Sequence, residues 1–219
     1  MQLSVNNTTL YYEVTGRGEP LILLHGNGED HTIFDRAAQV LAPRFTCFLP
    51  DSRGHGKSAP ADTLSYETMA DDIIGFIDAL GLRRPVLYGF SDGGIIGLMV
   101  AMKRPQLPSR LIISGANLNP RGVKLSLWLT LKLTTLFKKD PKLLLMLREP
   151  QIPPEALSAI AVPTLVLAGS RDLIREAHTR LIAASVPGAR LSILPGETHG
   201  SYIVHSEKIA RIILEETGA

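Results

Sequence analysis

The sequence predicts an α/β fold: a single domain over residues 1–219, with a mostly parallel sheet and helices on both of its faces. Short runs that are apolar at almost every position alternate with longer segments that have helical periodicity. A strand that is apolar throughout is expected where both faces of a parallel sheet are covered. In addition, glycine-rich polar loops directly follow several of the apolar runs, where open α/β sheets gather their functional groups.

The positions of the individual strands and helices follow from this alternation. Residues 1–6 and 10–15 predict an opening hairpin that turns at Asn6-Asn7. Further strands are expected near residues 21–24, 45–50, 85–89, 110–114, 164–168 and 190–194. Helices are expected near residues 33–42, 66–80, 93–104, 175–185 and 203–216. The alternation of strand and helix predicts parallel pairing of the later strands.

One segment, at about residues 118–163, interrupts the alternation. It contains leucine-rich helical stretches, proline-bounded loops and the single tryptophan, Trp128. Its seven basic and three acidic residues give it a net charge of +4. We expect this 118–163 segment to form a short helical cap over the site, as insertions between strands often do. The alternative is an ordinary helical hairpin packed against the edge of the sheet.

Composition excludes several classes of protein. The 23 basic and 21 acidic residues give a net charge of +2, which offers no reason to expect a nucleic-acid partner. The single cysteine, Cys47, excludes an internal disulfide framework and fits a cytoplasmic location, and its apolar neighbours predict a buried structural thiol. No signal peptide is visible at the N-terminus. The most apolar helix candidate, Val123 to Phe137, carries Lys132 and is too short to span a bilayer.

The residues Gly89-Phe90-Ser91-Asp92-Gly93 join an apolar strand to an apolar helix. A G-x-S-x-G sequence at a strand-to-helix junction is typical of a nucleophile elbow, a turn so sharp that side chains two positions either side of the serine would collide. Such a turn lifts the serine Oγ clear of the sheet and directs the first helical N–H groups at the same point. Ser91 is therefore the predicted nucleophile.

A serine hydroxyl needs a neighbouring base, itself oriented by a carboxylate. Asp172 follows the strand near 164–168, and His199 follows the strand near 190–194, so both are expected at the same edge of the sheet as Ser91. The chain order Ser91, Asp172, His199 differs from the orders in chymotrypsin and subtilisin. Glu197 is the main alternative for the acid.

Other histidines and acids fit these roles less well. His205 is expected inside the last helix, and His178 lies within another predicted helix with no loop to deliver it. Asp92 is adjacent to the nucleophile, so its side chain should point away from the imidazole of His199. His25 directly ends a strand and is interpreted as a structural histidine that holds the following loop.

Acyl transfer also requires two N–H donors for the developing oxyanion. One is expected from the backbone of Asp92, and the other from the loop His25-Gly26-Asn27-Gly28. The backbone N–H of Asn27 is the first candidate there, and that of Gly28 is the next. Gly28 and Trp128 are also expected to contact the substrate, with the leucines of the 118–163 segment forming an apolar acyl pocket.

The segment Asp51 to Ser58 is rich in glycine but lacks the spacing of a phosphate-binding loop, so we interpret it as a structural loop beneath the catalytic one. No set of histidine, cysteine, aspartate or glutamate residues has convincing metal-ligand spacing, so no metal is expected.

Taken together, these residues resemble the α/β-hydrolase superfamily over essentially the whole chain. The markers are His25-Gly26, the D-x-R-G-x-G-x-S run from Asp51 to Ser58, the elbow around Ser91, Gly169 to Asp172, and His199. The resemblance implies an eight-stranded sheet and a Ser-Asp-His hydrolase without a cofactor. It is strongest to small carboxylesterases, enol-lactonases and C–C-bond hydrolases. The 118–163 segment is shorter than the cap usual in C–C hydrolases, and Gly200 stands where such enzymes often have an apolar or aromatic residue.

The leading hypothesis is a serine hydrolase, carboxylesterase-like, that cleaves a small ester or lactone through an acyl-enzyme. A ligand-sensing signalling protein with little turnover is the alternative from another class, and the basic face of the 118–163 segment would then be a docking surface. A cofactor-free perhydrolase and a C–C-bond hydrolase are further alternatives.

Overall fold

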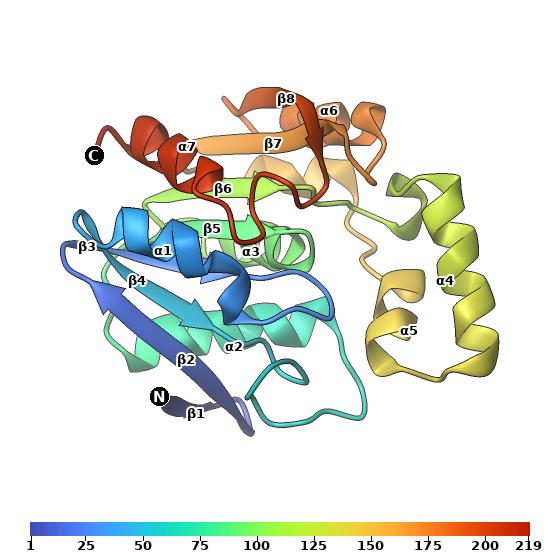
Figure 1. The fold of residues 1–219 in the computed structure, drawn as a ribbon, viewed down its shortest axis with the longest axis horizontal. Coiled ribbons are helices and arrows are strands. Elements are labelled where there is room, and N and C mark those ends of the chain that lie inside the picture. The colour runs from blue at the N-terminus through green and yellow to red at the C-terminus, as the bar shows by residue number, and fades with distance from the viewer.

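The computed structural model describes residues 1–219 and contains one eight-stranded sheet in the order β1-β2-β4-β3-β5-β6-β7-β8 (Figure 1). The strands are β1 Gln2–Val5, β2 Thr8–Gly16, β3 Glu19–Leu24, β4 Phe45–Pro50, β5 Val86–Phe90, β6 Arg110–Ser114, β7 Thr164–Arg171 and β8 Arg190–Thr198. β1, β2 and β4 pair antiparallel, and all pairings from β4 to β8 are parallel. The predicted α/β fold is confirmed.

The sheet separates two hydrophobic cores. Helices α2 Tyr66–Ala79, α3 Asp92–Lys103 and α6 Glu176–Ser185 pack on one face, and α1 Asp35–Leu41 and α7 Lys208–Thr217 pack on the other. Successive strand residues point to opposite faces, so in β3 Ile22 and Leu24 belong to the first core and Leu21 and Leu23 to the second. Burial on both faces explains why the parallel strands are apolar at every position.

Strands β7 and β8 extend beyond the predicted ends at 168 and 194, and two helices begin later than predicted. The first helix is preceded by a 3₁₀ turn, η1 His31–Phe34, so regular α-helix begins only at Asp35. The last helix begins at Lys208 and not near 203, and the prediction that His205 lies inside it is wrong. His205 has a φ of +48°, which no helix accommodates, and its N–H donates to Ile33 O at 2.8 Å. This hydrogen bond to a distant segment therefore keeps the backbone around His205 out of the helix.

The 118–163 segment contains η2 Pro120–Gly122, α4 Leu125–Phe137, α5 Pro141–Arg148 and η3 Pro154–Ala159. In Figure 1, α4 and α5 stand side by side beyond the carboxyl ends of the strands, and α4 forms the outer margin of the molecule. The side chain of Asp140 caps α5 by accepting a hydrogen bond from Lys142 N at 2.9 Å. None of the helices has both the length and the apolar character that crossing a membrane requires.

Cys47 lies on β4 with its side chain in the second core. It is fully buried and forms no disulfide, as the sequence predicted. Burial raises the pKa of the thiol to about 12, so the group stays protonated and unreactive in the folded protein.

Candidate active site

Ser91 stands alone between β5 and α3, with a φ of +53° and a ψ of −114°. Few residues other than glycine adopt this region of backbone space, and a strained conformation is expected of an elbow nucleophile. A Cβ on Gly89 would lie 2.1 Å from Gly93 O, and one on Gly93 would lie 2.2 Å from Leu24 O. The expectation that glycines flank the serine for lack of space is confirmed.

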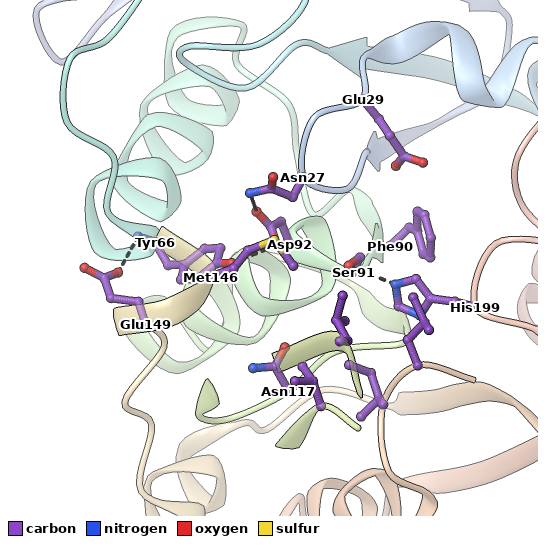
Figure 2. A pocket seen from close by; sticks show the side chains of 14 residues that line it. Asn27, Glu29, Tyr66, Phe90, Ser91, Asp92, Asn117, Met146, Glu149 and His199 are labelled. Atoms are coloured by element: carbon purple, nitrogen blue, oxygen red, sulfur yellow. Dashed lines mark hydrogen bonds between the residues drawn. The ribbon is translucent and has the colours of Figure 1, made fainter. Parts of the chain in front are cut away.

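His199 links Ser91 to Asp172. Its Nε2 lies 3.1 Å from Ser91 Oγ, and its Nδ1 lies 2.6 Å from Asp172 Oδ1. The hydrogen bond between Ser91 and His199 is drawn in Figure 2. Ser91 and His199 are 108 residues apart in the sequence. Each of the three residues directly follows the carboxyl end of a strand. Parallel pairing brings these strand ends to one edge of the sheet.

The Asp172 carboxylate is held rigidly behind the imidazole. Besides His199, it accepts the N–H of Ile174 at 2.9 Å and the N–H of Gly169 at 3.3 Å. Burial would raise the pKa of Asp172, but the hydrogen bond and charge of His199, together with the two N–H donors, outweigh it and leave the pKa below its usual value. The group is therefore ionised at neutral pH and suited to stabilise an imidazolium.

Glu197, the alternative acid, is occupied elsewhere. It lies on β8, and its carboxylate binds Lys208 Nζ at 2.5 Å and Ser201 Oγ at 2.6 Å. The structure thus brings Asp172 to His199 and leaves Glu197 in an exposed ion pair. His178 is also engaged outside the site, because its Nε2 accepts the N–H of Leu118 at 2.9 Å.

Gly115, directly after β6, lies under the imidazole of His199. Its φ is +61°, and a Cβ there would lie 2.6 Å from His199 Cε1. On another side the ring of Phe90 packs against the imidazole, with ring centroids 4.9 Å apart. His199 is therefore positioned by contacts on several sides as well as by its two hydrogen bonds.

Two backbone N–H groups are available near Ser91. Asn27 N makes no hydrogen bond within the protein, and Asp92 N is the first N–H of α3, where no preceding helical carbonyl can accept it. The loop approaches the elbow closely, since a Cβ on Gly26 would lie 3.1 Å from Ser91 Cβ. The side chain of Asn27 is tied down by donating to Asp92 Oδ2 at 2.9 Å and to Lys142 O at 3.2 Å.

His25 braces this loop from below. Its Nε2 accepts the N–H of Ser52 at 2.9 Å, and its Nδ1 lies 2.8 Å from Gly26 O. This pattern requires the neutral tautomer with a proton on Nδ1. Burial lowers the pKa of His25 to about 4, which agrees with a neutral imidazole. These contacts support the predicted structural role.

The loop from Asp51 to Ser58 packs beneath the His25 loop, as expected. Asp51 Oδ1 accepts hydrogen bonds from His31 N and Nδ1 at 2.8 and 2.7 Å, and Oδ2 accepts Lys57 N at 2.8 Å. Asp30, His31 and Asp51 lie close enough to share a metal ion. However, Asp30 already accepts the N–H and the hydroxyl of Thr32, so the cluster is satisfied by hydrogen bonds.

A cavity of about 180 Å³ opens beside Ser91 and His199 (Figure 2). Its apolar lining comes from Tyr66, Phe90, Val123, Leu127, Met146, Leu173 and Ile174. Its polar lining comes from Asn27, Glu29, Ser91, Asp92, Asn117, Glu149 and His199. The lining thus includes three carboxylates and no lysine or arginine, and the 118–163 segment supplies part of its wall.

Two residues that were expected to contact the substrate lie outside this lining. Gly28 is exposed at the surface of its loop, with a φ of +73° and open space around it. Trp128 lies on the part of α4 that faces a separate depression, shared with Arg121 and Arg175. Consecutive side chains of an α-helix point about 100° apart, so Leu127 reaches the cavity and the adjacent Trp128 does not.

Three residues of the cavity lining were not predicted from the sequence: Glu29, Tyr66 and Glu149. Tyr66 donates through its hydroxyl to Asp92 Oδ1 at 2.7 Å, and its N–H donates to Glu149 at 2.9 Å. Glu29 accepts the N–H of Gly26 at 3.0 Å, and burial raises its pKa above the usual value. Burial likewise raises the pKa of Asp92. Only Glu29 could have been suspected, since it lies on the same loop as Asn27.

Comparison with known proteins agrees with this architecture. A family model described as alpha/beta hydrolase fold matches residues 19–136. The mouse serine hydrolase BPHL is 28% identical, over 97% of this chain and 84% of its own length. An esterase from Thermogutta terrifontis has a TM-score of 0.82 at 23% identity, covering 99% of this chain and 96% of its own. The enol-lactonase from Burkholderia xenovorans has a TM-score of 0.82 at 19% identity, with each chain fully covered.

The matched residues include the strand before the His25 loop, the Asp51–Ser58 loop and the whole elbow around Ser91. The match to the family model covers more than half of the chain. The sheet order and the helices on both faces of the sheet agree with this family. The chain therefore belongs to the α/β-hydrolase fold family.

Proposed function

We propose that the protein is a serine hydrolase that cleaves a small, uncharged carboxylic ester or lactone through an acyl-enzyme. The observation that carries the proposal is the continuous hydrogen-bonded series from Ser91 Oγ through His199 to Asp172. Relatives named as a serine hydrolase, an esterase and an enol-lactonase support the same class of reaction.

In the acylation step, His199 Nε2 takes the proton from Ser91 Oγ as Oγ attacks the carbonyl carbon of the substrate. The ionised Asp172 holds the Nδ1–H and stabilises the imidazolium that forms. The N–H groups of Asn27 and Asp92 donate to the developing oxyanion. The tetrahedral intermediate then expels the alcohol oxygen, which takes the proton from His199 Nε2, and the acyl group remains on Ser91.

Deacylation repeats these proton transfers with water as the nucleophile. His199 removes a proton from a water molecule, whose oxygen attacks the acyl carbon and forms a second oxyanion at the same donors. Collapse of this intermediate releases the carboxylic acid and returns the proton to Ser91 Oγ. In a lactone the acid and alcohol are one molecule, which leaves as the hydroxy acid.

The cavity supports a small and uncharged substrate. Its volume of about 180 Å³ is below the range common for drug-sized ligands. Glu29, Asp92 and Glu149 line it, and no cationic side chain does. A substrate that carries its own carboxylate would meet like charge in a partly buried site. We further propose that the 118–163 segment is the cap of this cavity, because Leu127 and Met146 lie in its wall.

A fluorophosphonate probe tests the proposal, because it reacts with activated serine hydroxyls. We expect a single adduct on Ser91, measured by mass spectrometry of the intact and digested chain. Ser91→Ala should abolish the adduct, and His199→Ala should nearly abolish it. Ser185→Ala, which removes a hydroxyl from the exposed side of α6, is the matched control and should label normally.

Turnover of p-nitrophenyl acetate and of a carboxylate-bearing analogue of similar size then tests the substrate class. The neutral ester should be hydrolysed faster, and the difference should narrow at high salt. A folded protein that gives no adduct and no turnover would contradict the proposal and would favour ligand binding as the role of the cavity.

A further inference from the structure

Helix α4 presents an apolar surface to solvent. Leu125, Leu129, Leu133, Leu136 and Phe137 are between 45% and 90% exposed. Their spacing along a helix of 3.6 residues per turn places them on one side, and we call these five residues the outer face of α4. The opposite side holds the buried Leu131 and the cavity-lining Leu127.

An α-helix that carries apolar side chains on two opposite sides is ordinarily packed on both of them. In this protein only the inner side of α4 has a partner, and Figure 1 shows the helix at the margin of the molecule with no element beyond it. Scattered exposed leucines need no explanation, but five large apolar side chains on one helix form a contiguous patch of the kind that marks an interaction site.

Basic residues surround the outer face. Residues 118–139 contain five basic side chains and no acidic one. Lys124 directly precedes the helix, Lys138 and Lys139 directly follow it, and all three are exposed. Lys132 lies within the helix, with its Nζ 4.7 Å from the centre of the Trp128 ring. The nearest carboxylate in the chain, that of Asp140, pairs with Lys138 at 3.1 Å.

We propose that α4 docks the protein onto an anionic lipid surface, with the helix lying in the plane of the membrane interface. An apolar helical face bordered by lysines matches the acyl chains and the acidic headgroups of such a surface. The 13 residues of α4 extend about 20 Å along the helix axis, which is less than the hydrocarbon thickness of about 30 Å. The helix therefore lies along the surface and does not cross it.

Charge argues against a second copy of the chain as the occupant of the outer face. A symmetric dimer would place each outer face on its equivalent, and the surrounding lysines of the two copies would then meet. Like charges in such an interface oppose association. Anionic lipid instead complements every charge around the patch except Asp140.

Docking would bring the cavity close to the membrane, because Leu127 on the same helix lines it. The docking itself does not depend on the proposed hydrolysis. The catalytically inactive variant Ser91→Ala is therefore expected to bind vesicles as the unmodified chain does, so the two proposals can fail separately.

The test uses the full chain and sucrose-loaded vesicles of mixed phosphatidylglycerol and phosphatidylcholine. We expect co-sedimentation that weakens as salt is added, and much less binding to vesicles of phosphatidylcholine alone. Trp128 is the only tryptophan and lies on α4, so its emission should shift to the blue on binding. Brominated lipid should quench that emission.

Two pairs of variants locate the contact. Leu133→Ser combined with Phe137→Ser should lower the vesicle partition coefficient by about tenfold or more. Leu181→Ser, which alters an exposed leucine on α6, should not lower it. Lys138→Glu with Lys139→Glu should lower binding to anionic vesicles. Arg83→Glu is the charge control, because Arg83 is exposed and lies before β5, at the amino ends of the parallel strands and away from α4.

The proposal is overturned if the chain does not bind anionic vesicles, or if the α4 variants and their controls bind equally. It is also overturned if sedimentation velocity shows a dimer that the Leu133 and Phe137 substitutions dissociate while vesicle binding is absent. Circular dichroism of each variant establishes that a loss of binding does not come from unfolding.

Discussion

Tyr66 donates a 2.7 Å hydrogen bond to the buried carboxylate of Asp92, the residue that follows Ser91 at the start of α3. The bond joins the beginning of α2 to the elbow, and the N–H of the same tyrosine joins both to Glu149 at the end of α5. One residue, through its hydroxyl and its backbone N–H, thus connects the 118–163 segment, α2 and the residue expected to donate to the oxyanion.

Tyr66→Phe should therefore loosen the elbow. It leaves a buried carboxylate without one of its donors, and such a loss costs about 1–3 kcal/mol of the free energy of unfolding. We also expect a lower kcat with a largely unchanged KM on a model ester, because the N–H of Asp92 would be less well held. Urea denaturation and steady-state kinetics measure the two effects.

Tyr88→Phe is the matched control, since that buried hydroxyl donates to the neutral Ser114 Oγ at 3.1 Å. It should cost less stability than Tyr66→Phe. Equal effects of the two variants would show that the charge of Asp92 plays no part.

Gly115→Ala should displace the imidazole of His199 and so reduce the reactivity of Ser91 more than it reduces the stability of the fold. Its Cβ would lie 2.6 Å from His199 Cε1, so the ring must move away from Ser91. Gly188→Ala is the control, because its φ of +67° is similar to the +61° of Gly115 but no atom lies within 4 Å of the added carbon. Each substitution should cost about 1–2 kcal/mol for the left-handed backbone.

Only Gly115→Ala should slow the fluorophosphonate reaction. Labelling rates at matched fractions of folded protein distinguish the two variants. Normal labelling of Gly115→Ala would mean that the imidazole tolerates displacement.

Asp172→Asn should lower kcat by about 10³–10⁴-fold, because an amide neither holds the required tautomer nor stabilises the imidazolium. Glu197→Gln, which alters the carboxylate paired with Lys208, should change kcat little. A greater loss from Glu197→Gln than from Asp172→Asn would exchange the roles of the two acids.

The Asp172 variant also has a pH signature. Because the folded-state pKa of Asp172 lies below its usual value, the ionised carboxylate contributes stability that is present above about pH 4 and is lost as pH falls through the folded-state pKa. The stability difference between the unmodified chain and Asp172→Asn should therefore shrink in acid.

The contribution of Glu29 to stability depends on pH in the opposite direction from that of Asp172. Burial raises its pKa, so the folded state favours the protonated form, and its favourable contribution at low pH is lost as pH rises through the folded-state pKa. Glu29→Gln keeps an acceptor for Gly26 N but carries no charge. Its stability relative to the unmodified chain should rise between about pH 4 and pH 7.

Chemical denaturation across that range measures the trend. Glu19→Gln, at an exposed position on β3, is the matched control. A relative stability of Glu29→Gln that falls with pH would show that ionised Glu29 stabilises the fold.

The strands and the elbow could be predicted because their causes are local. Apolar runs such as Leu21 to Leu24 are strands wherever both faces of a sheet are covered, and the collision that requires Gly89 is with Gly93 O in the same turn. Asp172 and His199 could be placed at one sheet edge because parallel strands share a direction, and the structure shows them hydrogen-bonded there.

Contacts between distant segments decided the rest. His205 departs from the helix that local propensity favours because its N–H is bound by Ile33 O. Tyr66 and Glu149 are 83 residues apart, so no spacing rule relates them to each other or to the cavity. Which side of α4 faces the cavity depends on the packing of α4 against α5, and the leucines on its two sides are alike in sequence. For this reason the chain alone reveals the chemistry expected at Ser91, whereas the shape and charge of the cavity and the exposed face of α4 emerge only once the segments are packed together.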